Sequence, residues 1–329
     1  MTGLASGLDG MGDRAALVKH ARASIKRGSR SFAAASRLFD RATRERVWLL
    51  YAWCRACDDL ADAQDHGRTM GDQGGAAARF EQIQELTDKA FAGKPTGHPS
   101  FDALGVLARE VPITPAMAQD VIAGFALDAD EWRPRNEADM LRYCYHVAGA
   151  VGVMMAVVMD VGSTDEDTLD RACDLGLAFQ LANISRDVCE DDAAGRCYLP
   201  VEWLAEADIP PGEVTKPHYR EALVPLVRRL CDLAQHYEAS ARTGAARLRF
   251  RQRWAILSAA DIYGAIARQV SALGKQAWDH RVHTTKLQQA GFVARAFVCS
   301  FSAPPAAPKP RWSRRDLASL ARLDSPNSD

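Results

Sequence analysis

The feature that most constrains this sequence is a helical spacing of apolar residues along nearly its whole length. From Asp13 onward, apolar side chains recur every three or four residues, which places them on one face of an α-helix. Alanine, leucine and arginine, which are good helix formers, dominate these stretches. The spacing predicts helical segments at 15–37, 43–66, 76–92, 100–110, 115–130, 137–160, 166–192, 219–246, 252–280 and 284–298.

Strand-like alternation and Asn-Gly hairpin turns are absent from the 329 residues, and no repeat of fixed period or central linker interrupts them. The simplest fold is therefore a single all-α domain over 13–302, a bundle of about ten helices. We expect a disordered Gly-rich N-terminus over 1–12. We also expect a flexible, Pro-rich and basic tail over 303–329, with a short helix near 314–323.

Composition excludes several classes of protein. The chain has 41 basic and 42 acidic residues, so no polybasic field favours nucleic acid as a partner. Eight cysteines are scattered through mostly apolar stretches, and the N-terminus lacks the apolar core of a signal peptide. Both features indicate a cytoplasmic protein with reduced thiols. No apolar run reaches the roughly 18 residues of a membrane-spanning helix, so we expect no such span.

One acidic stripe lies in the middle of the chain, in NISRDVCEDD at 183–192. Asn183, Asp187 and Asp191 are four residues apart, so they share one face of a helix. Gln180 lies one turn earlier, near the same face. The preceding residues are apolar, and turning such a stripe inward is costly unless a cation neutralises it.

A second stripe ends an earlier apolar segment, in YAWCRACDDLADAQDH at 51–66. Asp58 and Asp62 are also four apart, with Asp59 beside them. One stripe of this kind is usually a solvated helix face. Two stripes, each at the end of an apolar run, favour two walls of one pocket.

Two kinds of cation could neutralise the stripes. Arg186 and Arg196 are near the second of them in the sequence. Hard divalent cations are the alternative, because they prefer carboxylate and amide oxygens. Magnesium usually takes one or two protein carboxylates and completes its shell with water and substrate phosphates. If magnesium binds here, a diphosphate ester is the natural ligand.

Four segments resemble the squalene/phytoene synthase family, most closely its bacterial phytoene-forming branch. SRSF at 29–32 resembles the N-terminal box, and YAWCRACDDLAD at 51–62 resembles the first aspartate-rich motif. RYCYHVAGAVG at 142–152 resembles a family helix, and GLAFQLANISRDVCEDDAAGRCYLP at 176–200 the second aspartate-rich motif. AWDHR at 277–281 is a weaker match. No acidic position of these motifs departs from the family pattern.

The resemblance implies one all-helical domain of the isoprenoid synthase type around a central cavity. It implies catalytic roles for Asp58, Asp62, Asp187, Asp191, Tyr51 and Tyr263. The implied metal ligands are Asp58, Asp59, Asp62, Asn183, Asp187 and Asp191. The implied substrate-binding residues are Ser29, Ser31, Phe32, Arg55, Tyr143, Val151, Gly152, Gln180, Asn183, Arg196, Tyr198 and Arg281, with Gly152 leaving room for the prenyl chain.

The resemblance also implies Mg²⁺ as the cofactor, with Mn²⁺ as a substitute and without a nicotinamide. The implied reaction joins two geranylgeranyl diphosphates head to head into phytoene, through a cyclopropylcarbinyl (prephytoene) diphosphate. This is the first committed step of carotenoid biosynthesis. A long dry cavity would keep water from the carbocations that form on the way.

Three alternatives remain. A C30 synthase of the dehydrosqualene or squalene type would use farnesyl diphosphate. The depth of the cavity, and not the motifs, decides between this C15 substrate and the C20 substrate. A terpene cyclase is disfavoured because its second motif usually pairs Asn with Ser or Thr and Glu, whereas this chain has N-x-x-x-D-x-x-x-D. Intact acids disfavour an inactive assembly subunit. Because the product is a hydrocarbon, the basic tail is a candidate for peripheral membrane contact, although a solvated tail is simpler; its relevant residues are Lys309, Arg311, Trp312, Arg314 and Arg315.

Overall fold

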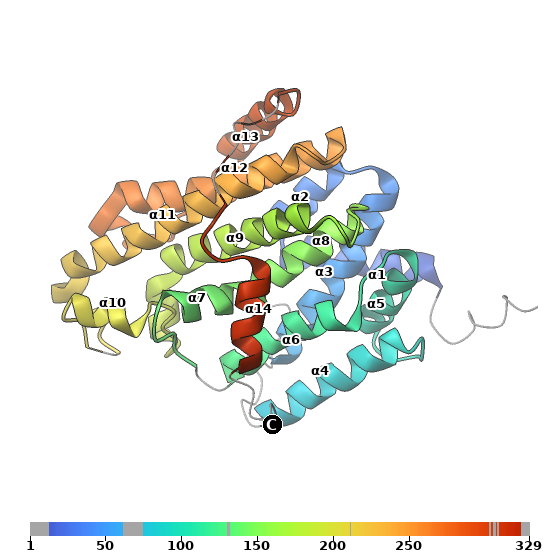
Figure 1. The fold of residues 1–329 in the computed structure, drawn as a ribbon, viewed down its shortest axis with the longest axis horizontal. Helices are drawn as coiled ribbons and strands as arrows, with labels where there is room; N and C mark the ends of the chain where they lie inside the picture. Colours follow the sequence, from blue (N-terminus) through green and yellow to red (C-terminus); the bar gives the residue numbers. More distant parts are fainter. Residues whose placement is uncertain are drawn as a thin grey trace, which may run out of the picture. The chain divides into compact units, whose positions relative to one another are not determined.

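The computed structural model describes residues 13–61, 75–129, 132–210, 212–302, 304, 307 and 309–323. Within these ranges the side chains of 30, 31, 76, 128, 129 and 320–323 are not described. Every regular element in this part of the chain is helical and none is a strand (Figure 1), which confirms the predicted all-α fold.

Contacts divide the described residues into two compact units. The single domain expected over 13–302 stays a prediction. The first unit takes its residues from Met1–Asp130 and Met154–Thr164. In it α3 packs against α1, α4, α5 and α6. Trp53, fully buried on α3, donates a 3.4 Å hydrogen bond to Thr87 on α4. The helices of this unit are α1 (Arg14–Gly28), α2 (Arg30–Ala35), η1 (Ser36–Leu38), α3 (Arg41–Ala61), α4 (Ala76–Phe91), α5 (Pro99–Glu110) and α6 (Pro115–Ala129).

The second unit comprises Glu131–Val153 and Asp165–Asp329, so the boundary falls within α8. Its long central helix is α9, which packs against α11 and α12, and α13 packs against α12. Its helices are α7 (Glu137–Cys144), η2 (Tyr145–Gly149), α8 (Ala150–Val158), α9 (Glu166–Ala193), α10 (Val201–Glu206), η3 (Pro217–Tyr219), α11 (Arg220–Ala245), α12 (Phe250–Leu273), η4 (Gly274–Gln276), α13 (Lys286–Cys299) and α14 (Arg314–Leu323).

Glycines allow α9 and the helix formed by α7, η2 and α8 to touch backbone to backbone. A Cβ on Gly152 would lie 2.3 Å from the carbonyl oxygen of Ala172, and one on Gly176 would lie 2.3 Å from that of Ala148. The sequence predicts that Gly152 leaves room for substrate. The structure gives this glycine a different neighbour, because the space beside its Cα is filled by α9. Its contact with substrate stays a prediction.

The middle of the helix over 137–158 has one π-helical turn, η2. The sequence predicts one uninterrupted helix over 137–160. The spacing of apolar residues alone does not reveal the extra residue of a π turn. Glu137–Val158 is also the one stretch of the described residues that is long and apolar enough to cross a bilayer. Because 72% of its apolar window is buried inside the fold, it has the surroundings of a core helix.

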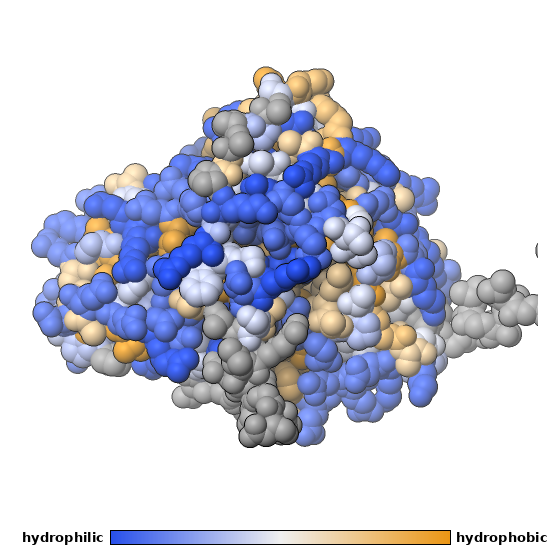
Figure 2. Space-filling view, viewed as in Figure 1, coloured by the Kyte–Doolittle hydropathy of each residue, from blue (hydrophilic) through white to orange (hydrophobic). Residues whose placement is uncertain are grey.

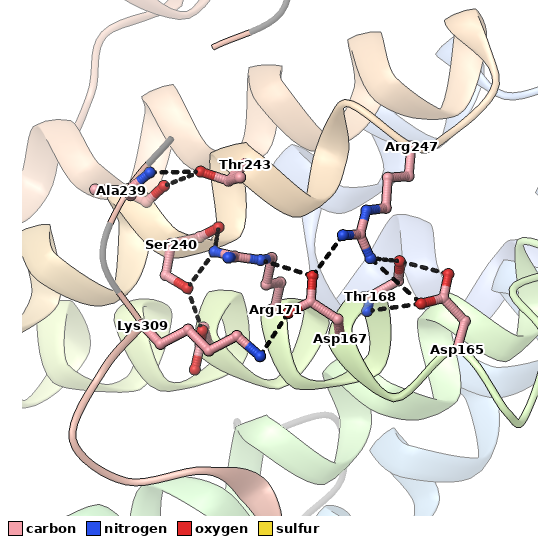
Figure 3. A network of polar contacts seen from close by, with 11 residues as sticks. Asp165, Asp167, Thr168, Arg171, Ala239, Ser240, Thr243, Arg247 and Lys309 are labelled. Atoms are coloured by element: carbon pink, nitrogen blue, oxygen red, sulfur yellow. Dashed lines mark hydrogen bonds and ion pairs between the residues drawn. The ribbon is translucent and has the colours of Figure 1, made fainter. Parts of the chain in front are cut away.

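The basic tail lies along the N-terminal half of α9. Lys309 pairs with Asp167 at 2.7 Å, in a network that also contains Arg171 and Arg247 (Figure 3). Arg314 pairs with Asp170 at 3.0 Å, and Leu317 on α14 is buried. The helix predicted near 314–323 is therefore present as α14 and packs against α7 and η2. The flexibility expected for 303–329 stays a prediction.

Candidate functional site

In the first unit, the acidic end of α3 is held by an arginine of the same helix. Arg55 pairs with Asp58 at 2.8 Å and hydrogen-bonds to Asp59. Burial lowers the pKa of Arg55, but the bond to Asp59 and the charges of both aspartates outweigh it, so this pKa lies above its ordinary value. Asp58 keeps 44% of its side chain exposed against 17% for Asp59, so Asp58 has more freedom to bind a ligand. Asp62 lies outside the described residues.

The segment around SRSF closes over the same face of α3. Ser29 caps α2 by accepting a 3.3 Å hydrogen bond from the backbone N–H of Phe32. The Phe32 ring lies 6.4 Å from that of Tyr51. A Cβ on Gly28 would come 2.3 Å from the Tyr51 hydroxyl, so this glycine lets the segment approach α3. Ser31 falls in α2, and its side chain is outside the description.

In the second unit, the predicted stripe lies on the half-buried side of α9. Gln180, Asn183, Asp187 and Asp191 are all partly exposed, whereas residues between them, including Ile184 and Val188, are buried. The four-residue spacing therefore identifies the face of α9 correctly. Their partial exposure leaves the oxygens accessible to a ligand.

Asp187 is held by two arginines. Arg186 donates from Nε at 2.6 Å, and Arg281 donates from Nε and Nη2 at 3.0 Å each. Burial alone would raise the pKa of Asp187, but these hydrogen bonds and charges outweigh it and bring that pKa below its ordinary value. The structure thus brings together two residues that the sequence assigns to one site although they are 94 positions apart.

The segment that carries Arg281 is fixed on both sides. Trp278 donates a 3.2 Å hydrogen bond from its indole to the carbonyl oxygen of Ser185 on α9. Arg220 pairs with Asp279 at 2.6 Å. Trp278 lies within the AWDHR match and Arg220 lies outside the matched motifs; both are positioning residues, since neither carries the chemistry of the site.

The end of α9 is shaped by a glycine. Gly195 has φ of +77°, a left-handed conformation that ends the helix. The backbone N–H of Arg196 then donates to the carbonyl oxygen of Asp191 at 2.8 Å. Thr215 hydrogen-bonds to the neighbouring Asp192. Asp192 therefore supports the turn, while Asp191 belongs to the predicted stripe.

Two aromatic stacks accompany the stripe. The Tyr143 ring lies 4.7 Å from that of Tyr198 and 6.1 Å from that of Trp132. The Tyr263 ring lies 4.2 Å from that of Phe179, and both pairs are nearly parallel. Burial raises the pKa of Tyr263 to about 12, although the charge of Arg186 opposes it. Tyr263 is therefore protonated at neutral pH, and its hydroxyl can donate.

The two acidic clusters offer the oxygen donors that a hard divalent cation prefers. Within the described residues no three His, Cys, Asp or Glu side chains gather closely enough to hold a metal by themselves. Each cluster instead balances its charge with arginine: Arg55 on α3, and Arg186 and Arg281 beside α9. A donor set of this kind suits a metal that shares its shell with substrate phosphates. Val151, on α8, is partly exposed.

Both clusters thus combine carboxylates with guanidinium groups at the polar end of an apolar helix, which is the arrangement of a polyanion-binding enzyme. The chain belongs to the squalene/phytoene synthase family, whose sequence model matches residues 25–288. Membership of this family implies dependence on a divalent cation.

Several relatives are close over most of their length. A phytoene synthase of Pseudescherichia vulneris is 47% identical over 272 residues, covering 82% of this chain and 87% of that protein. A 15-cis-phytoene synthase of Pantoea ananas is 43% identical over 308 residues, covering 91% and 98%. Among solved structures, a dehydrosqualene synthase has a TM-score of 0.75 at 26% identity and covers 86% of this chain and 96% of that chain. A squalene synthase from Alicyclobacillus acidocaldarius, at 21% identity with a TM-score of 0.70, supports the fold alone.

Proposed function

We propose that this protein joins two geranylgeranyl diphosphates head to head to make phytoene, as the first committed step of carotenoid biosynthesis. The observation that carries the proposal is the identity of 43–47% to proteins named phytoene synthase, together with an intact acid cluster on α3 and another on α9. The reaction is a transfer of a prenyl group.

The chain's own residues would first bind and orient the two diphosphates. Arg55 and Arg281 carry guanidinium forks that match phosphate oxygens, and each already lies beside a carboxylate. Asp58, Asp59 and Asp62 would hold one set of Mg²⁺ ions, and Asn183, Asp187 and Asp191 another, with Gln180 assisting the second set. Bound Mg²⁺ would neutralise the charge that develops on the leaving diphosphate.

The reaction then balances in two halves. The C–O bond of one allylic diphosphate breaks, the diphosphate leaves with the electron pair, and the double bond of the second substrate attacks the cation. Loss of a proton closes the cyclopropane of prephytoene diphosphate. The second half breaks the remaining C–O bond, rearranges the cation and loses a proton to give the hydrocarbon, so no reductant is consumed. The aromatic faces of Phe179 and Tyr263 could stabilise a nearby cation.

A C30 coupling of two farnesyl diphosphates is the second candidate. The observation in its favour is the likeness to a solved dehydrosqualene synthase. The higher identity to phytoene synthases favours the C20 substrate. We further propose a cytoplasmic location, because all eight cysteines are free thiols.

The test is incubation of purified protein with Mg²⁺ and either geranylgeranyl or farnesyl diphosphate, without nicotinamide, followed by extraction of hydrocarbons. We expect a C40 product from the C20 substrate, lost with EDTA. A C30 product from farnesyl diphosphate alone would assign the protein to the C30 branch. A product with unchanged carbon number would indicate a cyclase.

A further inference from the structure

The exposed face of α13 is apolar, the reverse of what a surface helix of a soluble domain normally shows. Leu287 is 84% exposed, Val298 is 67% exposed and Phe301, just beyond the helix, is 70% exposed. Ala296, on the opposite side, is fully buried against α12. Between Lys286 and Lys309 the only charged residue is Arg295. Hydrophobic surface accordingly gathers over α13 (Figures 1 and 2).

An aromatic cluster joins this face to the start of α12. The ring of Phe250 lies 5.6 Å from that of Phe297 and 5.0 Å from that of Phe301. Trp254 anchors the cluster, because its indole donates a 2.8 Å hydrogen bond to the carbonyl oxygen of Val293. Phe250 and Phe297 still keep 37% and 40% of their surface exposed. A rigid corner therefore presents aromatic and aliphatic side chains outward; we call it the α12–α13 face, formed by Phe250, Leu287, Phe297, Val298 and Phe301.

Positive charge surrounds this face. Arg249 and Arg251 are exposed at the first turn of α12, and Arg253 hydrogen-bonds to the carbonyl oxygen of Ser302. The sequence contains no Asp or Glu between Glu238 and Asp261, or between Asp279 and Asp316. Residues 239–260 and 280–315 therefore carry no acid, and Asp261, farther along α12, pairs with Arg295 of α13.

We propose that the α12–α13 face docks the protein on an anionic phospholipid bilayer. Exposed aromatic and aliphatic side chains with an arginine fringe match the acyl boundary and the charged headgroups of such a surface. A second copy of this chain fits less well, because a symmetric contact would bring two arginine fringes to one interface. The choice of a lipid rather than a protein partner rests in part on the proposed hydrocarbon product. Most of α13 lies outside residues 25–288, the part that the family model matches.

The structure also moves the expected lipid contact away from the tail. The basic tail residues Lys309, Arg314 and Arg315 pair with Asp167, Asp170 and Glu166 of α9, at 2.7, 3.0 and 2.9 Å. Their charges are already compensated by these acids of α9.

The experiment is co-sedimentation of the full chain, without substrate, with vesicles of phosphatidylcholine alone or mixed with phosphatidylglycerol. We expect binding to the anionic vesicles, weakened about tenfold or more by the triple variant Leu287→Ser, Val298→Ser and Phe301→Ser. Arg249→Gln with Arg251→Gln should weaken it roughly fivefold per arginine on anionic vesicles only. Two matched controls should bind like wild type: Val201→Ser with Leu273→Ser removes exposed apolar side chains elsewhere, and Arg22→Gln with Arg37→Gln removes exposed charges of α1 and η1.

Circular dichroism checks that each variant is folded, and an assay with detergent-dispersed substrate checks the active site separately. Vesicle binding needs no catalysis, so a failed product assay would leave this proposal standing, and lost vesicle binding would leave the proposed reaction standing. Three outcomes would overturn the docking proposal: wild type that does not bind anionic vesicles, face variants that bind like wild type, or controls that lose as much binding. A triple variant that turns a dimer into a monomer while keeping vesicle binding would make the face a contact between copies instead.

Discussion

Arg281 donates two parallel hydrogen bonds of 3.0 Å, from Nε and Nη2, to the two carboxylate oxygens of Asp187. This pairing joins the segment after α12 to the acidic stripe of α9. A guanidinium fork in this position can hold the carboxylate and remain available to phosphate oxygens of a substrate. The pair therefore links charge balance in the free protein to binding of a polyanion.

Asp187→Asn should lower the rate of hydrocarbon formation about a hundredfold, because the site loses charge needed at the leaving diphosphate. Arg281→Lys should lower it about tenfold, because an ammonium cannot make the bidentate contact. Steady-state assays of extracted product measure both. Arg41→Lys is the matched control, since Arg41, exposed in the first turn of α3, pairs with Glu45 at 2.9 Å and should keep near wild-type activity. Equal losses in all three variants would contradict the role given to the pair.

The packing of α8 on α9 gives a second prediction. Gly152→Ala should reduce the free energy of unfolding by about 3 kcal/mol, because its Cβ would come 2.3 Å from a backbone oxygen that cannot move alone. Gly291→Ala, in α13, has no atom within 4 Å of the new Cβ and should stabilise by about 1 kcal/mol through helix propensity. Urea denaturation distinguishes the two. The same sign for both substitutions would mean that the close contact is absent.

Asp174 predicts a pH-dependent stability. It is 5% exposed and accepts a 2.5 Å hydrogen bond from Ser240, and burial raises its pKa to about 7 from an ordinary 3.8. Because the folded pKa is raised, the contribution of Asp174 to the free energy of unfolding is fully present below about pH 4. This contribution is lost as the pH rises through 7.

Asp174→Asn removes this titration. The variant should therefore gain stability over wild type as the pH rises from 5 to 8, by roughly 2.5 kcal/mol. Unfolding curves of both proteins across this range provide the measurement. A difference between them that does not change with pH would show that Asp174 is ionised in the fold at every pH tested.

The tail supplies a fourth prediction. Leu317 on α14 is 1% exposed, so Leu317→Ala should cost about 2–3 kcal/mol if α14 stays packed in solution. Exposed Ser319→Ala in the same helix should change stability by less than about 0.5 kcal/mol. Thermal unfolding compares them. If neither substitution changes the stability, the result would support the flexible tail that the sequence predicts.

Local signals account for what the sequence predicts well. Apolar spacing finds helices because it reports one buried face, and it placed the ends of α6 at Pro115–Ala129 and of α13 at Lys286–Cys299 within about two residues. The same spacing predicted α1, α2 and η1 as one helix. The break between α1 and α2 lies at Ser29, which caps α2, and a serine is a weaker sequence signal of a helix end than a glycine or a proline. The stripe on α9 was predicted for the same local reason.

Features that depend on a distant partner could not be predicted. The contact between Gly152 and Ala172, and the stack of Tyr143 on Tyr198, join residues whose spacing carries no period. The pairing of the tail with α9 likewise could not be predicted from the sequence. A row of basic residues is typical of a solvated segment, and only the fold places the acidic partners beside it.

The most direct test of the central claim is the ratio of diphosphate released to hydrocarbon formed from geranylgeranyl diphosphate in Mg²⁺ buffer. Head-to-head coupling predicts two diphosphates for each C40 hydrocarbon, with both products lost together in Asp58→Asn and Asp187→Asn. One diphosphate for each C20 hydrocarbon would contradict coupling, and would mean that the acids of α3 and α9 ionise a single substrate.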